Sequence, residues 1–286
     1  MTASKDEPMT CDISLEVVGG RTLRVARWRL DTPSEHPPIL FFNGIGANIE
    51  AVAPLAEKLT ERSFIMFDMP GTGESPDPTV PYNPFTMAWT AAKVLDRFGI
   101  GQADVMGVSW GGAMAQHFAL QHPKRTRRLV LAATTPGMLM VPGDMSALSK
   151  MANPRRYVDA KYMNEHFATL YGGLTKNPAA KAHHIGRLKP PSPRGYVYQL
   201  LAMLGWTSAP ALPFLKTETL VMMGEDDAIV PVINGRILAS LIPNARLEVF
   251  PGAGHLFLLT HPEESTALLR EFLDAPESER EARRAA

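Results

Sequence analysis

Three residues that lie far apart in the sequence have the side chains that catalysis by a serine nucleophile requires. Ser109 is the centre of the segment Gly-Val-Ser-Trp-Gly at positions 107–111, and Asp227 and His255 follow it in the chain. A serine hydroxyl becomes a strong nucleophile when a histidine accepts its proton and a carboxylate orients that histidine. The two glycines are typical of a sharp strand-to-helix turn that exposes the serine. We therefore predict that Ser109, Asp227 and His255 form a catalytic triad.

The acid and the base of this triad are chosen by their positions after predicted strands. Three carboxylates at 225–227 follow the strand predicted at 219–223, and Asp227, three residues after the glycine that ends this strand, is the preferred acid. Asp226 is the alternative. Among the 8 histidines, His255 is the one in a glycine-rich loop after a late strand, predicted at 246–250. Both loops leave the same edge of a parallel sheet as Ser109, so the three side chains are expected to meet.

A tetrahedral intermediate also needs hydrogen-bond donors for its oxyanion. The segment Asn-Gly-Ile-Gly at 43–46 follows a strand predicted at 39–42. With a serine on a strand-to-helix turn, one donor comes from such a loop and the other from the residue after the nucleophile. We predict that the backbone N–H groups of Ile45 and Trp110 are these donors. The glycines of the loop are also compatible with an ordinary turn.

Strands and helices alternate along most of the chain. Strands are predicted at 13–18, 22–29, 39–42, 64–67, 104–108, 129–133, 219–223 and 246–250, and helices at 49–62, 85–98, 111–121, 232–241 and 262–273. Because most of the strands are continuously apolar, the pattern predicts a mostly parallel sheet covered by helices on both faces. The alternation stops between 136 and 213, where helical segments appear without strand signals. This interruption predicts a helical cap inserted after the sixth strand.

The motifs and the alternation together indicate the α/β-hydrolase fold. We expect an α/β core formed by residues 13–135 and 214–274, and a cap formed by residues 136–213. Residues 1–12 and 275–286 are expected to be flexible tails.

The composition limits the partners and the cofactors. Lys and Arg total 29, as do Asp and Glu, so no charge excess indicates nucleic-acid binding. Hydrophobic residues make up 45%, yet no run of about 18 apolar residues predicts a transmembrane segment. No cluster of His, Cys and Asp has the spacing of metal ligands, so neither a metal nor another cofactor is expected. Cys11 is the single cysteine and no secretory signal is recognised, which favours the cytoplasm.

Several segments resemble the intracellular depolymerases of medium-chain-length poly(3-hydroxyalkanoate). The similarity extends from residue 39 to residue 273 and includes Asn-Gly, in place of the commoner His-Gly, at 43–44. In the cap, Pro-Arg-Arg-Tyr at 154–157 and Gly-Trp-Thr-Ser at 205–208 are similar. Further similar segments lie at 129–134, 141–143, 171–173 and 254–258.

This resemblance implies hydrolysis of the ester bonds of a storage polyester through an acyl-enzyme on Ser109. It implies a location in the cytoplasm at polymer granules, with the granule surface and its coat proteins as partners. We also expect Asn43, Gly44 and Trp206 to bind the substrate. The related polymer synthases have a cysteine at the nucleophile position, so the serine favours hydrolysis over polymerisation.

The cap has a composition of its own. Residues 137–208 contain 9 Lys or Arg and 3 acidic residues, a net charge of +6, together with six methionines. One interpretation is an apolar lid over a hydrophobic acyl pocket, with a basic outer rim that meets a granule or its coat proteins. The other is that the methionines form the core of the cap and the charges form a solvated face. The sequence leaves both open.

Other functions are compatible with the same residues. A general carboxylesterase or lipase, or a C–C bond hydrolase for ring-cleavage products, would have the same triad. A ligand-binding protein on the same scaffold is a further alternative, but the presence of all three triad residues argues against it. Haloalkane dehalogenases and epoxide hydrolases use an aspartate nucleophile, which Ser109 argues against.

Overall fold

The computed structural model describes residues 11–153, 155–172 and 178–276, so the predicted tails lie almost entirely outside it. An eight-stranded sheet runs through the described chain in the order β1-β2-β4-β3-β5-β6-β7-β8. The strands are β1 Cys11–Val18, β2 Arg21–Trp28, β3 Ile39–Phe42, β4 Phe64–Phe67, β5 Ala103–Val108, β6 Thr126–Ala132, β7 Glu218–Gly224 and β8 Ala245–Phe250. The pairs β1–β2 and β2–β4 are antiparallel, and all later neighbours are parallel. The predicted mostly parallel sheet is confirmed.

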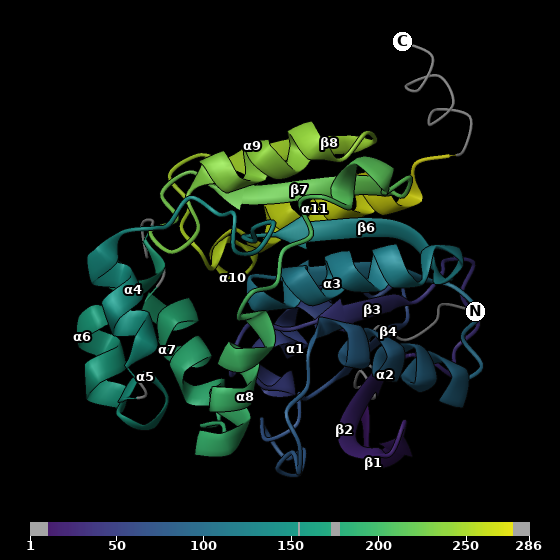
Figure 1. Ribbon diagram of the computed structural model, residues 1–286, viewed down its shortest axis with the longest axis horizontal. Coiled ribbons are helices and arrows are strands. Elements are labelled where there is room, and N and C mark those ends of the chain that lie inside the picture. Colours follow the sequence, from purple (N-terminus) through teal and green to yellow (C-terminus); the bar gives the residue numbers. More distant parts are fainter. Residues whose placement is uncertain (1–10, 154, 173–177, 277–286) are drawn as a thin grey trace, which may run out of the picture.

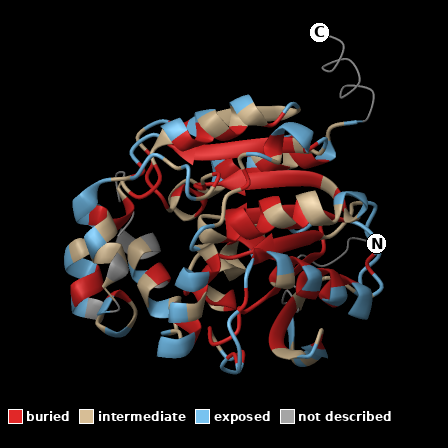
Figure 2. Cartoon of the chain, in the orientation of Figure 1, coloured by how far each residue is buried: buried red, intermediate tan, exposed pale blue. Residues whose placement is uncertain are grey.

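Helices cover both faces of this sheet because side chains on each strand alternate between two cores (Figures 1 and 2). The helices of the core are α1 Ile49–Lys58, α2 Pro84–Arg97, α3 Trp110–Gln121, α9 Val232–Leu241, α10 Phe257–Thr260 and α11 Pro262–Asp274, with 3-10 turns at Pro123–Arg125 and Leu212–Phe214. In β3, Leu40 and Phe42 pack in the cluster that includes α2, α3 and α9, whereas Ile39 and Phe41 pack in the cluster that includes α1, α10 and α11. Because β4, β3, β5, β6, β7 and β8 run parallel, their carboxyl ends lie at one edge of the sheet.

Buried charges explain where the predicted element boundaries were wrong. The helix predicted at 49–62 ends at Lys58, because Arg62 turns inward and pairs with Asp104 at 3.2 Å. Strand β6 begins at Thr126, three residues earlier than predicted, since Arg127 pairs with the same aspartate and Arg128 is fully buried. Charged residues inside a strand weaken the apolar pattern from which strands are predicted.

Among the described residues between β6 and β7 there are five helices, which confirms the predicted cap insertion after the sixth strand. They are α4 Met145–Ala152, α5 Arg155–Val158, α6 Ala160–Tyr171, α7 Pro178–Arg187 and α8 Pro193–Met203. Helix α8 begins with a proline after Ser192, whose side chain accepts a hydrogen bond from the Gly195 N–H at 2.9 Å. The chain leaves and re-enters the core at neighbouring points, since the Ser208 N–H donates to the Pro136 carbonyl at 3.0 Å. Figure 1 shows the cap beside the carboxyl ends of the parallel strands.

Within the described ranges, none of the helices has the length and apolar character needed to cross a lipid bilayer.

Candidate active site

Ser109 lies on a sharp turn between β5 and α3, with the backbone angles φ 55° and ψ −123°. These values are strained for a residue with a side chain, and such strain is common at functional sites. A Cβ atom at Gly107 would lie 2.3 Å from the Gly111 carbonyl, and one at Gly111 would lie 2.1 Å from the Phe42 carbonyl. Both glycines of the motif are therefore required by the close approach of the backbone around Ser109.

His255 and Asp227 form a buried pair at the same edge of the sheet. The Nδ1 atom of His255 lies 2.7 Å from Oδ2 of Asp227, whose Oδ1 accepts the N–H groups of Ile229 and Val230 at 2.9 Å each. A carboxylate can only accept, so the Nδ1 N–H of His255 is the donor in this hydrogen bond. Asp226, the alternative acid, is exposed to solvent. Of the two aspartates, Asp227 is the one placed to orient His255.

The backbone N–H groups of the loop after β3 that lie nearest Ile45 are mostly bonded within the protein. The Gly44 N–H donates to Oδ1 of Asn43 at 2.9 Å, and the Ala47 N–H donates to the Gly44 carbonyl. The Gly46 N–H donates to Oε1 of Gln199 at 2.6 Å. Among the described residues, the Ile45 N–H has no such partner, and neither has the Trp110 N–H in the first turn of α3. These are the two donors that the sequence predicted for an oxyanion.

Gln199 of α8 connects the cap to both proposed oxyanion donors. Its side chain accepts from Gly46, next to Ile45, and its backbone carbonyl accepts from the indole N–H of Trp110 at 2.9 Å. Its amide nitrogen donates to Oγ1 of Thr72 at 2.6 Å. Gln199 is 1% exposed. One buried residue of the cap thus bonds both to the loop that contains Ile45 and to Trp110, the residue after Ser109.

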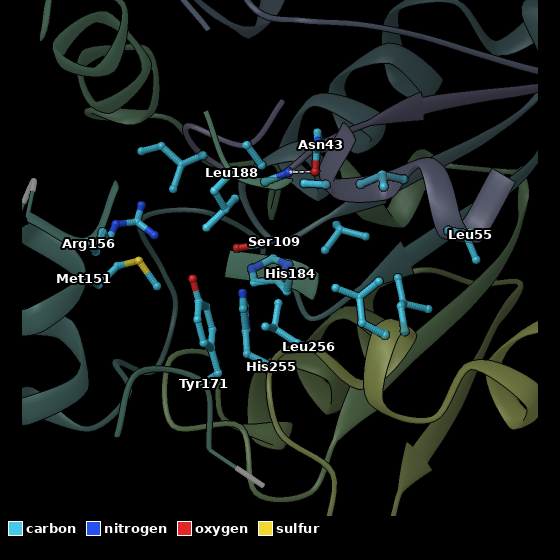
Figure 3. A pocket seen from close by; sticks show the side chains of 18 of the residues that line it. Asn43, Leu55, Ser109, Met151, Arg156, Tyr171, His184, Leu188, His255 and Leu256 are labelled. Carbon is cyan, nitrogen blue, oxygen red and sulfur yellow. Dashed lines mark hydrogen bonds between the residues drawn. The ribbon is translucent and has the colours of Figure 1, made fainter. Parts of the chain in front are cut away.

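Ser109 and His255 line one cavity between the core and the cap (Figure 3). One side is apolar and comes from the core, with Phe41, Val52, Leu55, Leu258 and Leu259. The other side comes from the cap and carries the polar groups of Arg156, Tyr157, Tyr171 and His184, with Met151 beside them. In Figure 3, Arg156 and Leu55 lie on opposite sides of Ser109. In the part of the chain that is described, no group of His, Cys, Asp or Glu could hold a metal ion.

Tyr171, at the end of α6, fixes the position of His255. The Tyr171 carbonyl accepts the His255 N–H at 2.6 Å, and the two rings are stacked with an interplanar angle of 13°. A Cβ atom at Gly254 would lie 2.2 Å from the same carbonyl. The cap therefore helps to position the base as well as to close the cavity.

Arg156 is buried against tyrosines and does not belong to a basic outer rim. It is 4% exposed, and its guanidinium donates to the hydroxyls of Tyr157 and Tyr196. The guanidinium also lies over the Tyr157 ring at 4.1 Å from the centroid. Its neighbour Arg155 is exposed and pairs with Asp159 at 2.6 Å. Within the Pro-Arg-Arg-Tyr segment, one arginine faces solvent and the other faces the cavity.

His184 of α7 lies beside this arginine and is neutral at pH 7. Burial, followed by the positive charges of Arg156 and Arg187, lowers its pKa to about 4. Its ring packs edge-on against Phe167 and Tyr171. Burial also raises the pKa of the Tyr171 hydroxyl. The groups around Arg156 are therefore uncharged.

The methionines of the cap divide between the two interpretations. Met163 is buried in the cap core and Met151 lines the cavity, whereas Met138 and Met145 are exposed. Neither interpretation of the sequence describes the whole cap.

Asn43 and Gly44 line the cavity as expected, but Trp206 does not. The Trp206 indole N–H lies 3.2 Å from Nδ1 of His117, and the two rings pack together. Trp206 therefore lies outside this cavity, where the chain turns back to the core beside α3. The polar groups of Asn43 are also used within the loop, where its side-chain amide donates to the Asn48 carbonyl.

Sequence reasoning missed Arg156, Tyr171, His184 and Gln199 as residues of the site. Two of them lie in segments that resemble the depolymerases, at 154–157 and 171–173. That resemblance within an insertion of otherwise irregular sequence was the signal available for them.

The fold and the site define a class of protein. Residues 37–262 match the family described as alpha/beta hydrolase fold, and the chain belongs to this family. The chain is 44% identical to poly(3-hydroxyalkanoate) depolymerase of Ectopseudomonas oleovorans over 238 residues, which cover 82% of this chain and 84% of that protein. The resemblance predicted from the sequence is confirmed. The chain is also 33% identical to 2-hydroxymuconate semialdehyde hydrolase of Pseudomonas putida, over 74% of this chain and 77% of that protein.

Solved structures share the same fold. An esterase from Exiguobacterium antarcticum superposes with a TM-score of 0.77 at 21% identity, covering 91% of this chain and 98% of the esterase. A thermophilic esterase from Thermogutta terrifontis superposes with a TM-score of 0.72 at 26% identity, covering 94% of this chain and 98% of the esterase. The predicted α/β-hydrolase fold is confirmed.

Proposed function

We propose that the protein is a serine hydrolase that cleaves ester bonds of medium-chain-length poly(3-hydroxyalkanoate) or its oligomers. The observation that carries the substrate class is the 44% identity to a poly(3-hydroxyalkanoate) depolymerase. The buried His255–Asp227 pair beside the strained turn at Ser109 supports the reaction type. The apolar side of the cavity supports a medium-length alkyl chain.

In this proposal, Nε2 of His255 takes the proton of Ser109 as its oxygen attacks the ester carbonyl. Asp227 holds the imidazole in the required tautomer and stabilises the imidazolium. The N–H groups of Ile45 and Trp110 bind the oxyanion. His255 then protonates the leaving alcohol, and water activated by the same histidine releases the acyl group from Ser109.

The test is hydrolysis of a purified medium-chain polymer latex with identification of the products. We expect 3-hydroxy acids or their short oligomers from the wild type and none from Ser109→Ala. Burial of four additional methylene groups is worth up to about 3 kcal/mol. Eight-carbon nitrophenyl esters are therefore expected to exceed four-carbon esters by roughly ten- to hundredfold in kcat/KM, below their aggregation threshold. A four-carbon optimum with no hydroxy acid from the latex would contradict the substrate class.

A C–C bond hydrolase is the second candidate, favoured by the 33% identity to 2-hydroxymuconate semialdehyde hydrolase. The two candidates share the fold and are separated by substrate. Turnover of a ring-cleavage dienoate at a rate above that of any ester would favour the second candidate.

We further propose that the protein acts in the cytoplasm at the surface of polymer granules, beside their coat proteins. Exposed apolar side chains on the cap support this contact. Leu200, Leu201 and Leu204 are exposed at the end of α8, and Met138 and Leu139 are exposed beside them. The two groups are adjacent, since the Met138 N–H donates to the carbonyl at position 206 at 2.9 Å. Clustered exposed apolar residues favour an apolar surface as the contact.

A further inference from the structure

Arg156 differs from the other buried arginines of the described chain. Arg24 pairs with Glu50 at 2.9 Å, Arg62 pairs with Asp104 at 3.2 Å, and Arg128 pairs with Glu218 at 3.3 Å. Arg156 is as deeply buried, but no carboxylate among the described residues pairs with it. A buried cation without an anion is unfavourable unless its partner arrives with a ligand.

The position of Arg156 indicates where that partner binds. Its side chain lines the cavity that holds Ser109 and His255, on the side away from the apolar residues of the core (Figure 3). The groups around it are neutral, namely three tyrosines and the unprotonated His184. The cavity therefore has an apolar side for an alkyl chain and a cationic side for an anion, with the nucleophile between them.

We propose that Arg156 binds the free carboxylate of the substrate, so that the enzyme attacks polyester chains from their carboxyl end. This inference rests on the proposed function, because the substrate is taken to be a linear chain of ester-linked 3-hydroxy acids. Such a chain has one free carboxylate, at the end opposite its free hydroxyl. Cleavage of any ester bond leaves this carboxylate on the alcohol product, so Arg156 recognises the leaving group and not the acyl group.

The step balances with the residues already described. The Ser109 oxygen forms a bond to the carbonyl carbon, and the bond from that carbon to the leaving oxygen breaks. His255 transfers the proton taken from Ser109 to the leaving oxygen, which gives a 3-hydroxy acid whose carboxylate stays bound to Arg156. The remaining chain stays on Ser109 until water releases it with a new free carboxylate, which Arg156 can bind in the next cycle.

The test uses two dimers of 3-hydroxyoctanoate, one with a free carboxylate and one capped as the methyl ester. The readout is the ratio of kcat/KM for the free acid to kcat/KM for the methyl ester, because a general loss of activity cancels in it. Charge-assisted hydrogen bonds of this kind give a ratio of roughly 10 to 100 in the wild type. Arg156→Met is expected to bring the ratio near one.

Arg155→Met is the matched control, since Arg155 is the adjacent arginine but faces solvent. It is expected to keep the wild-type ratio. If Arg156→Met does not fold, Arg156→Lys and the wild type still decide. The lysine keeps the positive charge without the bidentate guanidinium and is expected to give an intermediate ratio. Free 3-hydroxyoctanoate is expected to inhibit the wild type more strongly than its methyl ester.

A wild-type ratio near one, or a ratio that Arg156→Met leaves unchanged, would overturn the inference while ester hydrolysis of the dimers upheld the proposed function. Cleavage of neither dimer would overturn the proposed function, and this inference with it.

Discussion

Replacing Gln199 with leucine tests whether the cap positions the oxyanion donors. The substitution removes the acceptor of the Gly46 N–H and the donor to Thr72, at 2.6 Å each. A buried group left without a partner lowers stability by about 1–3 kcal/mol. Loss of one whole oxyanion donor lowers kcat by about 10² to 10³. Because the substitution displaces the segment next to Ile45 without removing its N–H, we expect kcat to fall by roughly 10- to 100-fold.

The assay is steady-state hydrolysis of 4-nitrophenyl octanoate, with unfolding by urea measured in parallel. KM is expected to change little, since the oxyanion exists only in the transition state and the intermediate. Thr72→Val is the matched control, because it breaks the hydrogen bond from the Gln199 side-chain amide to Thr72 and leaves the one to Gly46. It is expected to lower stability to a similar degree and kcat by less than roughly threefold. Equal losses of kcat in the two variants would refute the positioning argument and leave a general loss of stability as the cause.

Two further predictions concern the acid of the triad and the buried histidine. Asp227→Asn is expected to lower kcat by roughly 10⁴-fold, because the imidazole loses its orienting anion. Asp226→Asn, at an exposed position, is expected to change kcat little. The reverse ranking of the two variants in matched kinetics would contradict the assignment of Asp227 as the acid of the triad. The pKa of His184 is lowered to about 4 in the folded protein, so the unfolded chain binds a proton on this residue at higher pH than the folded chain does. The contribution of the neutral His184 to the free energy of unfolding is therefore fully present above pH 6.5 and is lost as the pH falls towards 4. His184→Gln is therefore expected to reduce the loss of unfolding free energy between pH 7.5 and pH 4.5 by about 2.5 kcal/mol, and an unchanged loss would contradict the burial of a neutral imidazole.

The core and the candidate triad were accessible from the sequence because each signal is local. The glycines around Ser109 and the loops with Asp227 and His255 directly follow apolar strands, and parallel strands bring their carboxyl ends together. The cap was different because its contacts join distant residues. Gln199 meets Gly46 across 153 positions, and no local pattern indicates such a pair.

Charge was the most misleading signal. A sequence count assigns Arg155 and Arg156 to the same basic surface, although the first faces solvent and the second lines the cavity. The side of a four-residue helix that faces inward depends on the helices around it, which the sequence pattern does not specify. The place of Trp206 outside the cavity has the same cause, since an aromatic residue at the end of an insertion can pack against the core as easily as against a ligand.

The central claim is that Ser109 is the nucleophile of a serine hydrolase. The most direct measurement is the reaction of the purified protein with a fluorophosphonate, followed by intact mass and peptide mapping. We predict one adduct per chain, located on Ser109, with no adduct in Ser109→Ala and a much slower reaction in His255→Gln. A wild-type protein that forms no adduct, or one that forms it on another residue, would contradict the account.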